Sequence, residues 1–175
     1  RVKSIILRQN GIKSRYYALD KKQRITHSNA ELACSAINKL FTTEEEKSGI
    51  QFLSCATSIP DQLIPSHASM VHGAAFEQPM EIASMAGVCM TGLMAFKTAW
   101  MSVASGNTDN AICAASELVS PTMLSRFFKE EIKCQQLIEE HPHIAFEKDF
   151  LRFMLSDGAA ALLLKNVPDG DVNLS

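Results

Sequence analysis

The chain has 175 residues, of which 46% are hydrophobic and 21% charged, so it is long enough for one globular domain with a hydrophobic core. No apolar stretch is long enough to cross a membrane and no signal-peptide pattern is present, so a membrane protein is not the expected class. The net charge of −2 at pH 7 and the lack of a nucleic-acid-binding motif argue against nucleic acid as a partner.

The basic residues are concentrated at the start of the chain. Residues 1–24 contain eight basic side chains and one acidic side chain, Asp20. Such a segment is either an ordinary solvated surface or a contact for an acidic or phosphate-bearing partner. We interpret residues 1–27 as a basic lead segment of a single domain that covers residues 1–175.

The cysteines indicate the compartment. There are five of them, an odd number, and no two form a Cys-x-x-Cys pair. This pattern argues against a disulfide framework and a zinc site, and it favours a reducing compartment such as the cytoplasm.

The predicted elements of the first half alternate between helices and strands. Ser28 and Glu31 form a capping box at the start of an amphipathic helix over residues 28–41. Residues 50–56 are mostly apolar and predict a strand, and a second helix is expected over residues 66–74.

The middle of the chain continues this alternation. Residues 81–88 predict a strand of small side chains, and residues 109–116 predict another apolar strand. The helix expected between them, over residues 91–105, is apolar nearly all round, which is typical of a buried helix. Apolar strands separated by helices predict an α/β fold, with a parallel sheet covered on both faces.

Residues 121–150 interrupt the alternation, and we interpret them as an insertion relative to the core. Within them, residues 122–140 predict an exposed amphipathic helix, whose apolar face packs against the domain, covers a substrate tunnel or contacts a partner. A turn at Asp157 and Gly158 then leads into a last buried strand over residues 159–164.

Cys89 is the strongest candidate for a reactive side chain. It lies between a predicted strand and a predicted helix, and a helix N-terminus favours thiolate over thiol. Its neighbours Gly87 and Gly92 are small and leave room for a substrate. The alternative is a packed core cysteine, because free cysteine is among the most frequently buried residue types.

The residues around Cys89 also resemble a known enzyme family. The segment Ala-Gly-Val-Cys-Met-Thr-Gly-Leu-Met-Ala-Phe is similar to the nucleophile segment of ketoacyl synthase III enzymes, which have the thiolase fold. Four further regions resemble that family in the same order along the chain: Asn10-Gly11-Ile12-Lys13-Ser14-Arg15; Ala56-Thr57-Ser58 with Ile64-Pro65-Ser66; Ser105-Gly106 with Asn110-Ala111-Ile112 and Ala115-Ser116-Glu117; and Leu155-Ser156-Asp157-Gly158-Ala159-Ala160.

The resemblance implies a fold and a reaction. The fold would be a thiolase-like three-layer α/β/α half-domain, with a mixed, mostly parallel sheet and a buried central helix. The reaction would be a decarboxylative Claisen condensation in fatty-acid or polyketide-type biosynthesis. Cys89 would take up an acyl group as a thioester, and a malonyl-thioester would lose CO₂ and attack it. The backbone N–H of Cys89 would contribute to the oxyanion hole.

The resemblance also implies partners. The acyl group would arrive on coenzyme A or on the phosphopantetheine of an acyl carrier protein, with no permanently bound cofactor. Many family members carry an arginine for coenzyme A where this chain has Gln9, with Arg8 alongside, so Arg8 and Gln9 are the candidates near that entrance. The family forms homodimers, and the loop Leu63-Ile64-Pro65 with the helix after it would lie at the interface.

The resemblance covers only the first half of such an enzyme. The family's catalytic His and Asn, or a second His, lie in a later half, and this chain ends before it. We therefore expect an N-terminal half that does not condense substrates alone and that associates through surface meant for its other half.

The remaining cysteines and histidines have simpler interpretations. Cys55 and Cys113 are expected in the core, whereas Cys34 and Cys134 lie on predicted helices and look incidental. His67 and His72 are expected to have a core or interface role. A metal site at His141 and His143, with Glu139 and Glu140, is less favoured than an exposed helix end, because structural zinc sites need four convergent ligands.

Two other classes of function stay open. One is a non-catalytic partner subunit of a thiolase-fold heteromer, against which the presence of Cys89 argues. The other is an unrelated cysteine acyltransferase or hydrolase, which would need a histidine that the sequence does not place near Cys89.

Overall fold

The computed structural model describes Arg8 and residues 11–124, 135–141 and 155–167. The chain divides into two compact units. The first combines Arg1–Thr26 with Leu118–Gly158, and the second combines His27–Glu117 with Ala159–Ser175. Within the described residues, no helix is both long enough and apolar enough to cross a membrane.

The second unit is built on a four-stranded sheet. Its strands are β1 (Phe52–Thr57), β2 (Glu81–Ala86), β3 (Asn110–Glu117) and β4 (Gly158–Lys165), in the order β2-β1-β3-β4. Strand β1 pairs in parallel with both β2 and β3. The N–H of Asn166 donates to the carbonyl of Asp109, so the end of β4 lies beside the start of β3, as in an antiparallel pair. The predicted mixed, mostly parallel sheet is confirmed.

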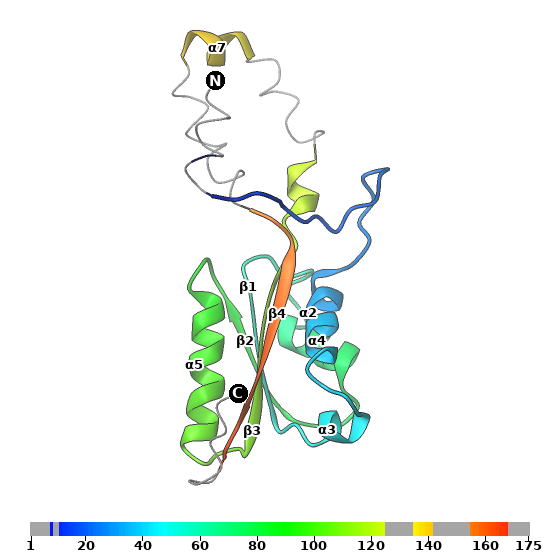
Figure 1. Cartoon of the computed structure of the whole chain (residues 1–175), viewed down its shortest axis with the longest axis vertical. Coiled ribbons are helices and arrows are strands. Elements are labelled where there is room, and N and C mark those ends of the chain that lie inside the picture. Colours follow the sequence, from blue (N-terminus) through cyan, green and yellow to red (C-terminus); the bar gives the residue numbers. More distant parts are fainter. Residues whose placement is uncertain (1–7, 9–10, 125–134, 142–154, 168–175) are drawn as a thin grey trace. The chain divides into compact units, whose positions relative to one another are not determined.

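Helices cover the two faces of this sheet and give three layers. Helices α2 (Asn29–Asn38) and α4 (His67–Ala75) lie on one face, and α5 (Thr91–Ala104) lies on the other (Figure 1). The capping box of Ser28 and Glu31 is present at α2, as predicted, and the side chain of Ser66 caps α4. A short helix, α3 (Glu44–Ser48), was not predicted, because it is entirely polar and has no apolar periodicity.

The alternation of side chains along β1 divides the core in two. Leu53 and Cys55 pack with α2 and α4, whereas Phe52 and Ala56 pack with α5. Since β1 is buried along its whole length, the two cores lie directly back to back across the central strand.

Helix α5 is buried along one stripe only. Thr91, Ala95, Ala99 and Val103 follow one another at four-residue spacing and are buried. The remaining large apolar side chains of the helix are exposed; they are Leu93, Met94, Phe96, Trp100 and Met101. Within this chain, therefore, the predicted central helix packs on the sheet through small residues and leaves an apolar face uncovered.

Two predictions about the later part of the chain are wrong. The last strand was expected to be buried, but β4 is at the edge of the sheet and most of its side chains are exposed or half-exposed. A helix was expected over residues 122–140, but Ser120–Met123 form a 3₁₀ turn and the extended backbone of Leu124 ends it. Helix α7 (Gln135–Glu140) lies within the predicted range, and residues 125–134 lie outside the described part.

In the first unit, one buried carboxylate joins three segments. Asp157 accepts hydrogen bonds from the backbone N–H groups of Ala18 (2.7 Å), Val119 (2.7 Å) and Ser120 (2.9 Å). Its own N–H donates to the carbonyl of Tyr16. The sequence predicted only a turn here; the structure adds that the carboxylate satisfies three backbone donors that would otherwise lack partners.

The close packing of α5 on the sheet makes a quantitative prediction. We expect Ala99→Leu to lower the free energy of unfolding by about 1–3 kcal/mol, because Ala99 is fully buried against the sheet and offers no room for a larger side chain. Ala104→Leu makes the same change at an exposed position of the same helix and should alter stability by less than about 0.5 kcal/mol. Urea unfolding measures both; equal effects of the two substitutions would contradict the packing.

Candidate active site

Cys89 lies in a tight turn between β2 and α5, and its side chain is exposed. The carbonyl of Val88 accepts hydrogen bonds from both the N–H (2.9 Å) and the hydroxyl (2.6 Å) of Thr91. These two bonds close the turn around Cys89 and fix the cysteine two residues before Thr91, the first residue of α5. The N-cap residue, Met90, makes no side-chain capping bond, so the partial positive charge at this helix end is not offset by a capping side chain.

Glycines lie on both sides of the cysteine, at positions 87 and 92. A Cβ atom on Gly87 would lie 2.9 Å from the hydroxyl oxygen of Thr91, which is closer than such atoms approach in practice. A Cβ atom on Gly92 would lie 3.4 Å from Cβ of Ala115 on β3. Gly87 therefore permits the turn, and Gly92 lies where the start of α5 comes close to β3.

The strand register places this turn at the end of the sheet where the carboxyl ends of β1, β2 and β3 meet. Ala56 of β1 is level with Ala115 of β3, and Thr57 is level with Ala86 of β2. The carboxyl ends of three parallel strands therefore end together, and Cys89 follows three residues after β2. Ligands of open α/β sheets bind outside this edge, so Cys89 has the position of a nucleophile that meets a substrate.

Polar side chains gather at the same ends of β1 and β3. Glu117, the last residue of β3, accepts a hydrogen bond from the N–H of Ser58, which follows β1. Nε2 of the buried His67 lies 3.0 Å from the hydroxyl oxygen of Ser116. The amide of Asn29 donates to the hydroxyl of Thr57 (2.7 Å). Sequence reasoning singled out His67 without these contacts and did not single out Glu117, because strand ends carry no side-chain periodicity.

The electrostatics of His67 follow from this packing. Burial lowers the pKa of His67 below its usual value of 6.5, while the carboxylates of Asp61 and Glu117 act in the opposite direction. Asp61 also accepts hydrogen bonds from the N–H groups of Asn29 (2.8 Å) and Ala30 (2.9 Å) at the start of α2. The neutral imidazole is therefore the form that the folded protein favours.

The other cysteines differ from Cys89. Cys55 and Cys113 are buried as predicted, and burial raises the pKa of the Cys55 thiol to about 12 and that of Cys113 to about 11. Cys34 on α2 is half-buried, with its sulfur 3.3 Å from the carbonyl of Ala74. Cys134 lies outside the described residues. Cys89 is thus the exposed cysteine of the described part of the chain.

Some of the other candidate residues lie outside the described part of the chain. Arg8 is exposed, and Gln9 and His143 lie outside the described residues. His72 makes a hydrogen bond with the carbonyl of Gln78 (2.8 Å). Among the described residues, no group of three or more histidine, cysteine or acidic side chains is placed to hold a metal ion.

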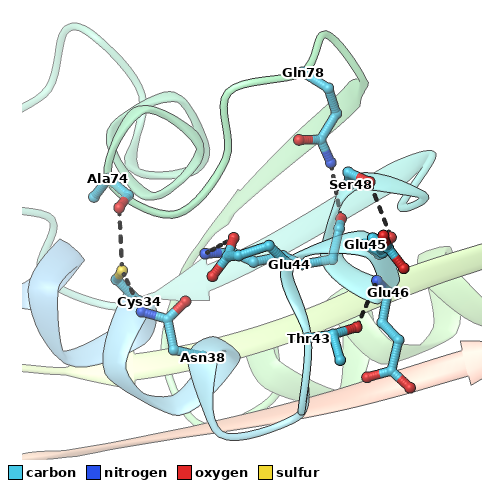
Figure 2. Close-up of polar contacts among 10 residues, drawn as sticks. Cys34, Asn38, Thr43, Glu44, Glu45, Glu46, Ser48, Ala74 and Gln78 are labelled. Carbon is cyan, nitrogen blue, oxygen red and sulfur yellow. Dashed lines mark hydrogen bonds and ion pairs between the residues drawn. The ribbon is translucent and has the colours of Figure 1, made fainter.

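A cavity of about 360 Å³ lies between α3 and the end of α4. The side-chain amide of Gln78 donates a hydrogen bond to the carbonyl of Lys47. Figure 2 shows this bond and the contact between Cys34 and Ala74. The Lys47 amine lies 5.6 Å from the centre of the Phe76 ring. Because α3 precedes β1, this cavity is at the amino end of the strands, the end opposite Cys89, and we assign it no part in the site.

The buried imidazole predicts a dependence of stability on pH. His67 binds a proton less readily in the folded protein than in the unfolded chain, so stability falls as pH falls below about 6.5. We expect His67→Gln to flatten this part of the curve, whereas Ser116→Ala, which keeps the imidazole, should retain it. Chemical unfolding between pH 5 and 7.5 measures the slopes; identical slopes in the wild type and His67→Gln would contradict the prediction.

Solved structures show the same fold. OleA of Xanthomonas campestris superposes with a TM-score of 0.71 at 20% identity, over 94% of this chain and 48% of OleA. AbyA1, a tetronic acid condensing enzyme, gives 0.69 at 19% identity, over 96% and 48%. The 3-oxoacyl-(acyl carrier protein) synthase III of Pseudomonas aeruginosa gives 0.67 at 16% identity, over 94% and 43%. The chain thus spans less than half the length of each structure.

A family model and the fold agree with the resemblance seen in the sequence. No curated protein sequence matches the chain. The model described as "Beta-ketoacyl synthase, N-terminal domain" matches residues 34–169, a range that contains Cys89 and strands β1 to β4. Because this match covers well over half of the chain, the protein belongs to the beta-ketoacyl synthase family, and the chain corresponds to its N-terminal domain.

Proposed function

We propose that this chain is the nucleophile-bearing half of a condensing enzyme of the ketoacyl synthase III type, acting in fatty-acid or polyketide-type biosynthesis. The observation that carries the proposal is the exposed Cys89 in a closed turn at the carboxyl edge of a parallel sheet, two residues before the start of α5. The family match and the fold of the superposed condensing enzymes support it.

The proposed reaction has two parts. The Cys89 sulfur attacks the carbonyl carbon of an acyl-thioester, the carrier thiol leaves, and an acyl-enzyme thioester remains. A malonyl-thioester then loses CO₂, and its carbanion attacks the acyl carbonyl. The carbon–carbon bond forms as the Cys89–acyl bond breaks, which releases a β-ketoacyl-thioester and restores the thiol. The backbone N–H of Cys89 contributes to holding the oxyanion in both parts.

The donor is proposed to be an acyl group on coenzyme A or on the phosphopantetheine of an acyl carrier protein, and no cofactor is bound permanently. The Pseudomonas aeruginosa synthase III carries an acyl carrier protein in its name, which supports this substrate class. A homodimer and a cytoplasmic location belong to the same proposal. The exposed Leu63 and Ile64 of the loop before α4 support an interface there.

A second domain is proposed to complete the site. The exposed apolar side chains of α5 form a surface that a single soluble domain rarely leaves uncovered. The superposed enzymes are more than twice as long as the region that matches. The residues that would assist decarboxylation and proton transfer are proposed to lie in that second domain.

Stoichiometric acylation tests the nucleophile. Incubation of the full-length protein with acyl-coenzyme A and with acyl carrier protein thioesters should add one acyl mass, located by peptide mass spectrometry on Cys89. Cys89→Ser should abolish the label, whereas Cys34→Ser, which changes a half-buried cysteine on α2, should retain it. A label that survives Cys89→Ser, or no label from any donor, would sink the proposal.

The need for a second domain is tested with the chain alone. We expect residues 1–175 to give no β-ketoacyl product from acyl- and malonyl-thioesters and to form oligomers through the face of α5. Replacing Trp100 and Met101, both about half-exposed, with lysine should reduce that association in light scattering. Condensation by the chain alone at the rate of the full-length protein would contradict this part of the proposal.

A further inference from the structure

Glu117, at the end of β3, carries a carboxylate that the proposed reaction does not use. Its Oε1 accepts the hydrogen bond from the N–H of Ser58. Its Oε2 is buried and has no hydrogen-bond partner among the described residues. A buried carboxylate oxygen without a partner is costly, so a residue that serves only the fold is more often fully satisfied.

The register places Glu117 in line with the cysteine turn. Ala56 is level with Ala115, so Ser58, two residues on, is level with Glu117. Thr57 is level with Ala86, and Ser58 and Gly87 are the residues that directly follow this pair. Glu117 therefore contacts the residue after β1 at the end of the sheet where the cysteine turn begins after β2.

Hydrogen bonds and one steric restriction hold these residues and the turn in place. The Glu117 carboxylate holds the backbone of Ser58, where β1 ends and its loop begins. Gly87 has no space for a Cβ atom because Thr91 lies against it. Thr91 in turn holds the carbonyl of Val88, the residue before Cys89. A shift of Ser58 would therefore reach the cysteine turn through the paired residues Thr57 and Ala86, which directly precede Ser58 and Gly87.

We infer that Glu117 is a positioning residue for Cys89: it fixes the end of β1 against the cysteine turn and so sets the direction from which the thiol meets an acyl-thioester. The inference rests on the proposed function. A displacement of about 1 Å at a reacting group costs as much as about 100-fold in rate, so a residue that acts only through the backbone still has a measurable effect.

Three substitutions separate positioning from general stability. Glu117→Gln keeps an oxygen that accepts the Ser58 N–H, Glu117→Asp keeps the charge but withdraws the carboxylate by one methylene, and Glu117→Ala removes both. We expect Ala and Asp to lower the rate constant of Cys89 acylation about 10- to 100-fold, with little change in the donor concentration for half-saturation. Gln should restore the rate to within about threefold. Glu45→Gln, at an exposed carboxylate on α3, is the matched control and should have the wild-type rate.

If Glu117→Ala does not fold, the acylation rates of Glu117→Gln and Glu117→Asp still test the positioning role. Glu117→Asp as fast as or faster than Glu117→Gln would overturn the inference, as would wild-type acylation by Glu117→Ala. Equal losses in Gln and Asp that follow a lowered melting temperature would also overturn it, since they indicate a structural role alone.

The rate of Cys89 alkylation by iodoacetamide, measured on the same variants, distinguishes failure of the proposed function from failure of the positioning role of Glu117. If the wild type accepts no acyl group while Glu117→Asp slows alkylation and Glu117→Gln does not, the proposed function fails and the positioning role stands. If the wild type is acylated and all Glu117 variants match it in both assays, the positioning role alone fails.

Discussion

The candidate site depends on the register between the central strand and its two parallel neighbours. Strand β1 is buried throughout and pairs with both β2 and β3, so the positions at which all three strands end are fixed by one set of backbone hydrogen bonds. A slip of one residue would turn every side chain of a strand to the other face of the sheet. The back-to-back cores around Leu53 and Phe52 oppose such a slip, and by opposing it they hold the cysteine turn in place.

The helix that follows Cys89 is suited to this arrangement by its small side chains. Ala95 and Ala99 let the axis of α5 lie close to the sheet, and Gly92 continues that approach to the first turn. Larger side chains on this stripe would lift the helix and carry the turn at Val88–Thr91 away from the strand ends. The same helix directs its large apolar side chains outward. Its inner side therefore supports the position of the cysteine, while its outer side is available to another domain.

Much of the fold and the position of Cys89 could be predicted from the sequence, because both rest on local signals. The capping box at Ser28, the cap at Ser66 and the apolar runs of β1 and β3 each lie within a few residues of what they specify. The exposure of β4 could not be predicted in this way. A run such as Ala159–Leu164 looks the same at the centre of a sheet and at its edge, and only the strand order decides between them.

The hydrogen-bond partners of Glu117 and His67 could not be predicted either, because they lie far away in the sequence. The Glu117–Ser58 bond and the His67–Ser116 contact join residues 59 and 49 positions apart, and no local pattern marks such pairs. The predicted helix over residues 122–140 failed at its start, where Asp157 accepts the N–H groups of Val119 and Ser120 and the 3₁₀ turn Ser120–Met123 ends at the extended Leu124. Contacts made from a distance outweighed helical propensity at that point.

The buried Asp157 has a consequence for how the protein is made. Its bond to the N–H of Ala18 joins residues 139 positions apart, and without it the segment around Tyr16 loses its anchor in the first unit. During synthesis from the N-terminus, residues 16–18 leave the ribosome long before the carboxylate that holds them. Residues 16–18 must therefore wait, without their native partner, until the 139 positions up to Asp157 have been synthesised.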